Sequence, residues 1–336
     1  METLGIVVPA YKIIYFEQAL KSIANQTCKN FTVYIGNDGS CEDFETIVRS
    51  YQREIPIVYK RYSENLGGRD LVAHWERCID MVKDEKWIWL FSDDDIMEAT
   101  CVENFYKSLT KNNNVDLLHF NISRINEQNN IIENCASFPA ILKSEDFLTK
   151  RLQGSISSCV MEYVFRKDHF LNSQRFQNFD LGWGTDDATW IKLGMRKGIH
   201  TIPDSRVFWR KSRFNISPNN WDQAIISRKL NAQICFANWT MEMIKSHQLK
   251  LEKDRLKVLL KSWFLNSMKQ SILFFTLRSS LSMLGAFYES IDEKAGYKLN
   301  AITLHSYKNY KTLVNLMKTS FLKINYLFHD ENKRVS

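Results

Sequence analysis

Three consecutive aspartates, Asp93, Asp94 and Asp95, follow the apolar run 87–91 of this 336-residue chain. Five apolar residues without Gly or Pro predict a short buried strand, so the carboxylates would lie where that strand leaves its sheet. In an open α/β sheet, ligands bind outside the carboxyl ends of the strands. A hard cation such as Mg²⁺ or Mn²⁺, bridged to substrate phosphates, would relieve the repulsion between these carboxylates. A solvated acidic turn or a helix N-cap is the alternative, because Asp serves both roles.

Further acidic residues lie at other predicted element boundaries. Asp38 lies in the turn 37–40, directly after a predicted strand, where its carboxylate is able to accept an N–H from a ligand. An Asx turn is the alternative, since Asn-Asp-Gly-Ser is a favourable turn sequence. Asp186 and Asp187 follow the turn 179–184 at the head of a predicted helix, where the helix dipole favours anions. Helix capping alone would explain Asp186.

The elements that position these residues alternate along the first hundred residues. Apolar runs predict strands at 4–10, 31–35, 55–61 and 87–92, and helical spacing predicts helices at 11–26, 42–53 and 70–82. Four strands joined by helices predict a parallel, doubly wound α/β sheet. Later apolar runs predict further strands at 115–122 and 200–207.

Two common nucleotide-binding devices are absent from the sequence. Pro9-Ala10-Tyr11-Lys12 follows the first predicted strand, so no G-x-G-x-x-G stands there to admit a pyrophosphate. A Walker A loop is also missing. A nucleotide would therefore have to bind by another device.

The composition is that of a folded protein, with 44% hydrophobic and 25% charged residues. Seven scattered cysteines without a Cys-x-x-Cys pair indicate neither a disulfide framework nor a zinc site, so a reducing, cytoplasmic compartment is expected. The apolar start of the chain is too short, and lacks a basic leader, for a signal peptide. We also find no apolar run long enough to span a bilayer.

Positive charge is concentrated in the last quarter of the chain. Residues 245–336 carry 16 Lys and Arg against 7 Asp and Glu, whereas the preceding residues are close to neutral. We predict two parts: an α/β domain at 1–218 and a basic, helical region at 219–336. The apolar stretch 271–288 suits packing against the first domain, and a helix lying in the membrane interface is the alternative. No recognised nucleic-acid-binding module is present, so nucleic acid is not an expected partner.

Four motifs occur in an order and spacing that resemble family 2 glycosyltransferases of the GT-A fold. They are Pro9-Ala10-Tyr11, the turn 37–40, Asn65-Leu66-Gly67 and the three aspartates 93–95, and the likeness covers roughly residues 3–215. The resemblance implies a Rossmann-like, mixed and mainly parallel sheet flanked by helices. The chain departs from the family pattern in three places: Lys12 replaces Asn, Asn37 replaces Asp, and Ser92 replaces the first Asp of the metal motif.

The resemblance implies roles for these residues toward a nucleotide-sugar donor. The donor-binding set would be Pro9, Ala10, Tyr11, Asp38, Arg69 and Asp93. Asp38 would accept the N3–H of uracil and Asp93 would bind the ribose, while a surface salt bridge is the alternative for Arg69. Asp94, the best candidate, and Asp95 would hold Mg²⁺ or Mn²⁺ on the diphosphate.

On the acceptor side the resemblance implies that Asp187 deprotonates the attacking hydroxyl and that Asp186 assists it. Trp183 would stack on a sugar, with a simple buried Trp as the alternative. Single displacement of this kind inverts the anomeric configuration.

The sequence as a whole predicts an inverting, metal-dependent glycosyltransferase of cell-surface polysaccharide synthesis. Its donor would be a nucleotide-diphosphate sugar, with UDP favoured, and its acceptor a glycan or a lipid-linked glycan at the inner face of the cell membrane. A catalytically degenerate nucleotide-sugar-binding protein is the alternative left open by Asn37 and Ser92. A nucleotidyltransferase fits less well, because Pro9-Ala10-Tyr11 is not a basic loop that would hold a triphosphate.

Overall fold

The computed structural model describes residues 2–215 and 221–312. The chain divides into two compact units, Met1–Leu260 and Lys261–Ser336. The sequence placed the division at residue 218, whereas in the structure the long helix α8 (Gln223–Lys245) belongs to the first unit.

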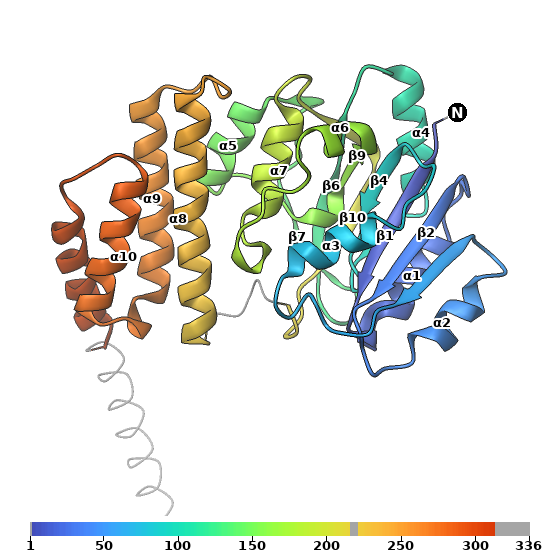
Figure 1. Ribbon diagram of the computed structural model, residues 1–336, viewed down its shortest axis with the longest axis horizontal. Helices are drawn as coiled ribbons and strands as arrows, with labels where there is room; N and C mark the ends of the chain where they lie inside the picture. Colours follow the sequence, from blue (N-terminus) through green and yellow to red (C-terminus); the bar gives the residue numbers. More distant parts are fainter. Residues whose placement is uncertain (1, 216–220, 313–336) are drawn as a thin grey trace, which may run out of the picture. The chain divides into compact units, whose positions relative to one another are not determined.

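A mixed sheet forms the centre of the first unit (Figure 1). Within the described residues its strand order is β3-β2-β1-β4-β9-β6-β10-β5, with β7 beside β6 and β8 beside β10. The strands are β1 (Leu4–Ala10), β2 (Phe31–Asn37), β3 (Ile57–Arg61), β4 (Trp87–Leu90), β5 (Ile96–Met97), β6 (Leu117–Ile125), β7 (Ile131–Asn134), β8 (Ile141–Leu142), β9 (Tyr163–Arg166) and β10 (Ile199–Arg210). Strands β1 to β4 run parallel, and β9 lies antiparallel between β4 and β6. The predicted mixed, mainly parallel sheet is confirmed.

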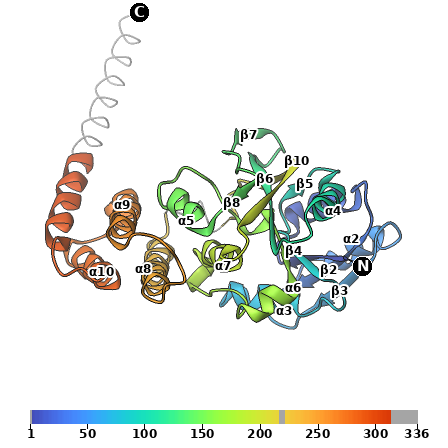
Figure 2. The same cartoon turned by 90° about the horizontal axis from the view of Figure 1, so that it is seen from above.

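Helices cover both faces of this sheet. They are α1 (Phe16–Ala24), α2 (Phe44–Tyr51), α3 (Leu71–Ile79), α4 (Cys101–Lys111), α5 (Ser144–Leu152), α6 (Lys167–Asn172) and α7 (Thr185–Gly194). Ile6 and Val8 share one buried core with α1, α2 and α4. Helix α3 packs against β1, β2 and β4, on the other side of the strands from α4 (Figure 2). Side chains alternate between the faces of a strand, which accounts for the buried residues along all of β1.

Local sequence explains where the first helices begin. Asp43 caps α2 by accepting from Thr46 N at 3.1 Å, and Asp70 caps α3 by accepting from Ala73 N at 2.9 Å. The helix predicted over 11–26 is shorter: a 3₁₀ turn, η1 (Ile13–Tyr15), comes first, and α1 starts at Phe16. The residues before η1 remain extended and belong to the candidate site.

The second unit is helical. It contains the later part of α9 (Lys253–Ser271), the short turn η4 (Ile272–Phe274), α10 (Leu277–Ser290) and a helix over 297–312. Phe264 and Phe287 stack in its core with ring centroids 4.1 Å apart. Among the described residues, no helix combines the length and apolar character needed to cross a membrane.

Candidate active site

The predicted functional residues of the first half meet at one edge of the sheet. Strand pairing sets Ala10 beside Asn37 and Val7 beside Leu90, so the carboxyl ends of β1, β2 and β4 are neighbours. Tyr11, Asp38 and the aspartates 93–95 follow these three ends directly. This is the edge at which ligands bind in open α/β sheets.

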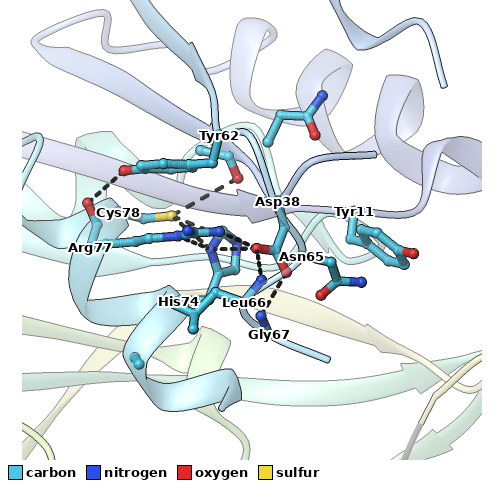
Figure 3. Close-up of polar contacts among 12 residues, drawn as sticks. Tyr11, Asp38, Tyr62, Asn65, Leu66, Gly67, His74, Arg77 and Cys78 are labelled. Carbon is cyan, nitrogen blue, oxygen red and sulfur yellow. Dashed lines mark hydrogen bonds and ion pairs between the residues drawn. The ribbon is translucent and has the colours of Figure 1, made fainter. Parts of the chain in front are cut away.

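Asp38 is 2% exposed and held by several donors (Figure 3). Its Oδ1 accepts from Leu66 N at 2.9 Å and its Oδ2 accepts from Gly67 N at 2.8 Å. The Arg77 guanidinium also donates to Oδ1, and His74 Nδ1 lies 3.3 Å from the same oxygen. Burial lowers the pKa of His74 to about 4, so the ring is neutral at pH 7 and Arg77 alone balances the carboxylate.

The neighbours of Asp38 are fixed in turn. Arg77 lies over the Tyr62 ring at 3.8 Å, and Tyr62 Oη donates to the Arg77 carbonyl at 2.8 Å. A Cβ on Gly67 would lie 2.7 Å from Asp38 Oδ2, so the loop over this carboxylate requires glycine. Asp38 therefore anchors the loop that carries Asn65-Leu66-Gly67, and its contact with a nucleobase stays a prediction. The half-exposed Tyr11 ring lies on the Asn65 side of this cluster (Figure 3).

The departure Asn37 has a structural role in this turn. Its Oδ1 accepts from Ser40 N at 2.9 Å and its Nδ2 donates to Tyr59 Oη at 2.9 Å. Both polar atoms of the Asn37 amide are therefore used, one in an Asx turn and the other in a hydrogen bond to β3. Asn37 is fully buried, so it supports the position of Asp38 from below the surface.

Asp93 joins the loops that follow β4 and β1. Its Oδ2 accepts from Tyr11 N at 2.8 Å and from Lys12 N at 3.1 Å. These bonds keep Tyr11 and Lys12 extended, which is why the first helix starts later than the sequence predicted. Ala10 is buried, and its carbonyl accepts from Asp38 N at 2.8 Å. The Pro9-Ala10-Tyr11 segment is thereby held beside Asp38 and Asp93 together.

Asp94 and Asp95 differ in their surroundings. Asp95 is 1% exposed and its Oδ1 accepts from Arg210 N at 2.7 Å, so this carboxylate holds β10 against the aspartate loop. The Asp94 side chain is contacted at 3.4 Å by Asn215 Nδ2. Arg210 is fully buried, donates from Nε to the Asp94 carbonyl at 2.7 Å and lies over the Tyr15 ring at 4.4 Å.

These carboxylates fit a hard divalent cation. Burial, and then the charges of Asp95 and Asp93, raise the pKa of Asp94 well above its usual value. Burial also raises the pKa of Asp95 to about 7. Within the described residues no group of three or more His, Cys, Asp or Glu forms a ready-made ligand cage. A cation bridged to phosphates needs only one or two carboxylates, which Asp94 supplies more freely than the engaged Asp95.

Arg69 lies away from this cluster of bonds. Its guanidinium pairs with Glu64 at 2.6 Å, and both side chains are more than 60% exposed. This is the surface salt bridge that the sequence left open. Such a pair contributes little to stability.

The second acidic pair lies in the first turn of helix α7. Asp187 is held by Arg151 of α5, and Asp186 Oδ1 accepts from Asp187 N at 2.9 Å. Burial, followed by the charge of Asp187, raises the pKa of Asp186 to about 7. Trp183, just before the helix, has Lys229 Nζ of α8 at 4.6 Å from its ring centroid. One face of the predicted sugar platform is therefore occupied by an ammonium group.

The stretch 156–162, which contains Cys159, contacts elements of both carboxylate clusters. Desolvation raises the pKa of its thiol, and the nearby charges of Glu162, Asp186 and Asp95 raise it further. The turn η2 (Val160–Glu162), which follows Cys159, contacts β4 and β10 on the donor side. Arg151, which binds Asp187, donates to the Ile156 carbonyl just before Cys159 at 3.0 Å. The structure thus brings the donor-side and acceptor-side aspartates to one region.

Sequence reasoning missed two arginines whose guanidinium groups hold these carboxylates, Arg77 and Arg151. Arg77 pairs with Asp38, 39 positions away, and Arg151 pairs with Asp187, 36 positions away. No spacing in the sequence points to such partners, because the pairs form only when the sheet is assembled.

Known proteins match the first part of the chain. Residues 5–169 match the sequence profile of Glycosyl transferase family 2. An uncharacterised glycosyltransferase of Rickettsia bellii is 24% identical over 237 residues, which are 67% of this chain and 31% of the relative. The GalNAc(5)-diNAcBac-PP-undecaprenol beta-1,3-glucosyltransferase of Campylobacter jejuni is 22% identical over 218 residues, 62% of this chain and 65% of that protein. The chain thus spans about a third of the rickettsial relative.

Solved structures match over most of the chain. TarS 1-349 of S. aureus, in complex with UDP-GlcNAc, aligns with a TM-score of 0.56 at 13% identity and covers 92% of both chains. This likeness shows a GT-A fold. Together with the profile match and the curated relatives, it establishes that residues 5–169 of this chain belong to glycosyl transferase family 2.

Proposed function

We propose that the protein is an inverting glycosyltransferase that moves a sugar from a nucleotide-diphosphate donor to a glycan or lipid-linked acceptor. The observation that carries the proposal is the meeting of the Asp38 loop, Asp93 and Asp94 at the carboxyl edge of the sheet, close to the pair Asp186–Asp187. The match to glycosyl transferase family 2 supports the reaction class.

The donor binds across the ends of β1, β2 and β4 in this proposal. Tyr11 stacks on the base beside the Asp38 loop, and the Asp93 carboxylate, already bonded to Tyr11 N, meets the ribose. A UDP-sugar is favoured because an N3–H of uracil suits a carboxylate. The TarS complex with UDP-GlcNAc, on the same fold, supports this choice.

Asp94, assisted by Asp95, would hold Mg²⁺ or Mn²⁺, which supplies neutralisation of the diphosphate leaving group as a Lewis acid. Asp187 takes the proton from the acceptor hydroxyl at its carboxylate. The hydroxyl oxygen then bonds to the anomeric carbon while the bond from that carbon to the diphosphate oxygen breaks. Attack from the opposite face inverts the configuration, and general-base assistance of this kind contributes about 10²–10⁴-fold.

A lipid-linked glycan is the favoured acceptor, in the synthesis of a cell-surface polysaccharide. The relative in Campylobacter jejuni, a GalNAc(5)-diNAcBac-PP-undecaprenol beta-1,3-glucosyltransferase, supports this choice. Trp183 meets the acceptor with the ring face that Lys229 does not cover. Peripheral contact with the membrane would bring the site to such an acceptor.

Thermal stability against a panel of nucleoside diphosphates and nucleotide sugars, with and without Mn²⁺, tests the donor site. A ligand at one hundred times its Kd stabilises the folded state by about 2.7 kcal/mol. We expect a metal-dependent rise in Tm with one base, lost in Asp94→Asn and kept in Asp84→Asn, an exposed aspartate before β4. No rise with any nucleotide, together with no release of nucleoside diphosphate, would contradict the proposal and favour a different role.

A further inference from the structure

Three carboxyl groups gather on the acceptor side around one guanidinium. Asp186 and Asp187 lie in the first turn of α7, and Glu162 comes from η2 (Val160–Glu162), before β9. Arg151 lies in the last turn of α5. Its charge acts on all three carboxyl groups, but its hydrogen bonds to carboxylate oxygens go to one of them.

Arg151 gives those bonds to Asp187. Its Nε lies 2.9 Å from Oδ1 and 3.0 Å from Oδ2, and its Nη2 lies 2.8 Å from Oδ2. The remaining Nη1 donates to the Ile156 carbonyl at 3.0 Å, which ties the guanidinium to the loop after α5. A fork that contacts both carboxylate oxygens fixes the plane of the carboxylate. The Asp187 side chain is 13% exposed, so it is not sealed from solvent.

The other two carboxyl groups have no such partner. Glu162 is fully buried, and its pKa is raised well above the usual value, chiefly by burial, so it keeps its proton. His119 Nε2 lies 3.3 Å from Glu162 Oε1, but burial lowers the pKa of His119 to about 3, so the two groups face each other uncharged. Asp186 bonds to the main chain at Asp187 N.

We propose that Arg151 is the positioning residue of the transfer reaction: by binding both oxygens of Asp187 it orients this carboxylate toward the acceptor hydroxyl. The inference rests on the proposed function, in which Asp187 is the base. It adds a residue from α5, distant in sequence from every motif of the family resemblance. Arg151 itself touches neither sugar nor nucleotide in this arrangement.

A double-mutant cycle tests the inference. Metal-dependent release of nucleoside diphosphate is measured, with and without acceptor, for wild type, Arg151→Gln, Asp187→Asn and the double variant. We expect Asp187→Asn to lower kcat by about 10²–10⁴-fold. Arg151→Gln should lower kcat by about 10-fold or more with the donor KM nearly unchanged, because only the transition state uses the oriented base. The double variant should be no slower than Asp187→Asn alone.

The variant Arg151→Lys separates the effect of orienting Asp187 from the effect of positive charge. It also shows whether a loss of activity in Arg151→Gln reflects misfolding. Lysine keeps the positive charge without the planar fork, so we expect kcat between those of Arg151→Gln and wild type. Arg175→Gln, which breaks the exposed Arg175–Asp80 pair of 2.6 Å, is the matched control and should leave kcat unchanged.

The outcomes distinguish the two levels of the proposal. A wild type that releases no nucleoside diphosphate from any donor contradicts the proposed function. An active wild type in which the two substitutions multiply, or in which Arg151→Lys is fully active, contradicts the role of Arg151 and leaves the transferase proposal standing. Melting temperatures of the same four proteins test the ion pair without activity: additive losses in Tm would overturn it.

Discussion

At the scale of the residue, the Asp38 carboxylate is needed both to hold the loop at 65–67 and, in the proposed function, to accept an N–H of the nucleobase. Its oxygens already accept from Leu66 N, Gly67 N and Arg77, and the side chain is almost completely buried. A nucleobase N–H would have to share an oxygen with these donors. Loss of ligand binding in an Asp38 variant would therefore report a collapsed loop as readily as a lost base contact.

Replacement of Asp38 by Asn tests this structural duty. The amide would leave the partly buried Arg77 without its counter-ion and would place an N–H against the two backbone donors. Breaking a buried pair from one side costs about 3–5 kcal/mol, and we expect about 3 kcal/mol in urea denaturation because Arg77 is partly solvated. Asp43→Asn, at an exposed helix cap, is the control and should cost about 1 kcal/mol or less. Equal losses for the two variants would show that the Asp38 network is weak.

The sequence identified the acidic residues of the site but not their partners. Asp38, Asp94 and Asp187 were recognisable because each follows a predicted element boundary. Arg77 and Arg151 lie within helices whose sequence gives no sign of a distant carboxylate. Arg69, beside Gly67-Gly68, pairs with Glu64 in solvent, which is the surface salt bridge given as the alternative, and its contact with the donor phosphates stays a prediction.

At the scale of the element, the local patterns predicted strands and helices well and their ends less well. Helix α1 starts after Tyr11 and Lys12 because Asp93, from a different loop, binds their N–H groups. Strand β9 lies antiparallel between β4 and β6, a place that depends on pairing across the fold. Periodicity reports burial along one segment and carries no information on such neighbours.

Strand β6 carries a pH-sensitive group. Burial holds the pKa of His119 at about 3, below the value of about 6.5 in an unfolded chain, so only the unfolded state binds this proton between those values. The unfolded state is therefore favoured as pH falls through this window, and stability is lost by about 1.4 kcal/mol per pH unit. We expect His119→Phe to flatten the pH dependence of the free energy of unfolding by that amount between about pH 6 and pH 4. Parallel curves for variant and wild type would show that His119 is protonated in the folded protein.

At the scale of the whole molecule, the boundary between the two compact units does not coincide with the point in the sequence where the basic excess begins. The compact units meet at Leu260, whereas the basic excess begins near residue 245. In the second unit, exposed lysines neighbour exposed apolar side chains: Lys298 is followed by Leu299, which is 67% exposed, and by Ile302, which is 56% exposed. Basic and apolar groups side by side suit the interface of an anionic membrane.

This surface leads to a prediction about vesicles. Each Lys near an anionic membrane contributes about 1 kcal/mol, an attraction that salt screens. The full chain should therefore sediment with vesicles that contain phosphatidylserine at low salt, and less at high salt. Lys294→Glu with Lys298→Glu should weaken this binding, whereas Lys83→Glu with Lys111→Glu, two exposed lysines of the first unit, should not. If neither pair of substitutions changes sedimentation, or if neutral vesicles bind equally well, the basic region does not recruit the enzyme to lipid. A lipid-linked acceptor would then have to reach the site through contacts of the first unit alone.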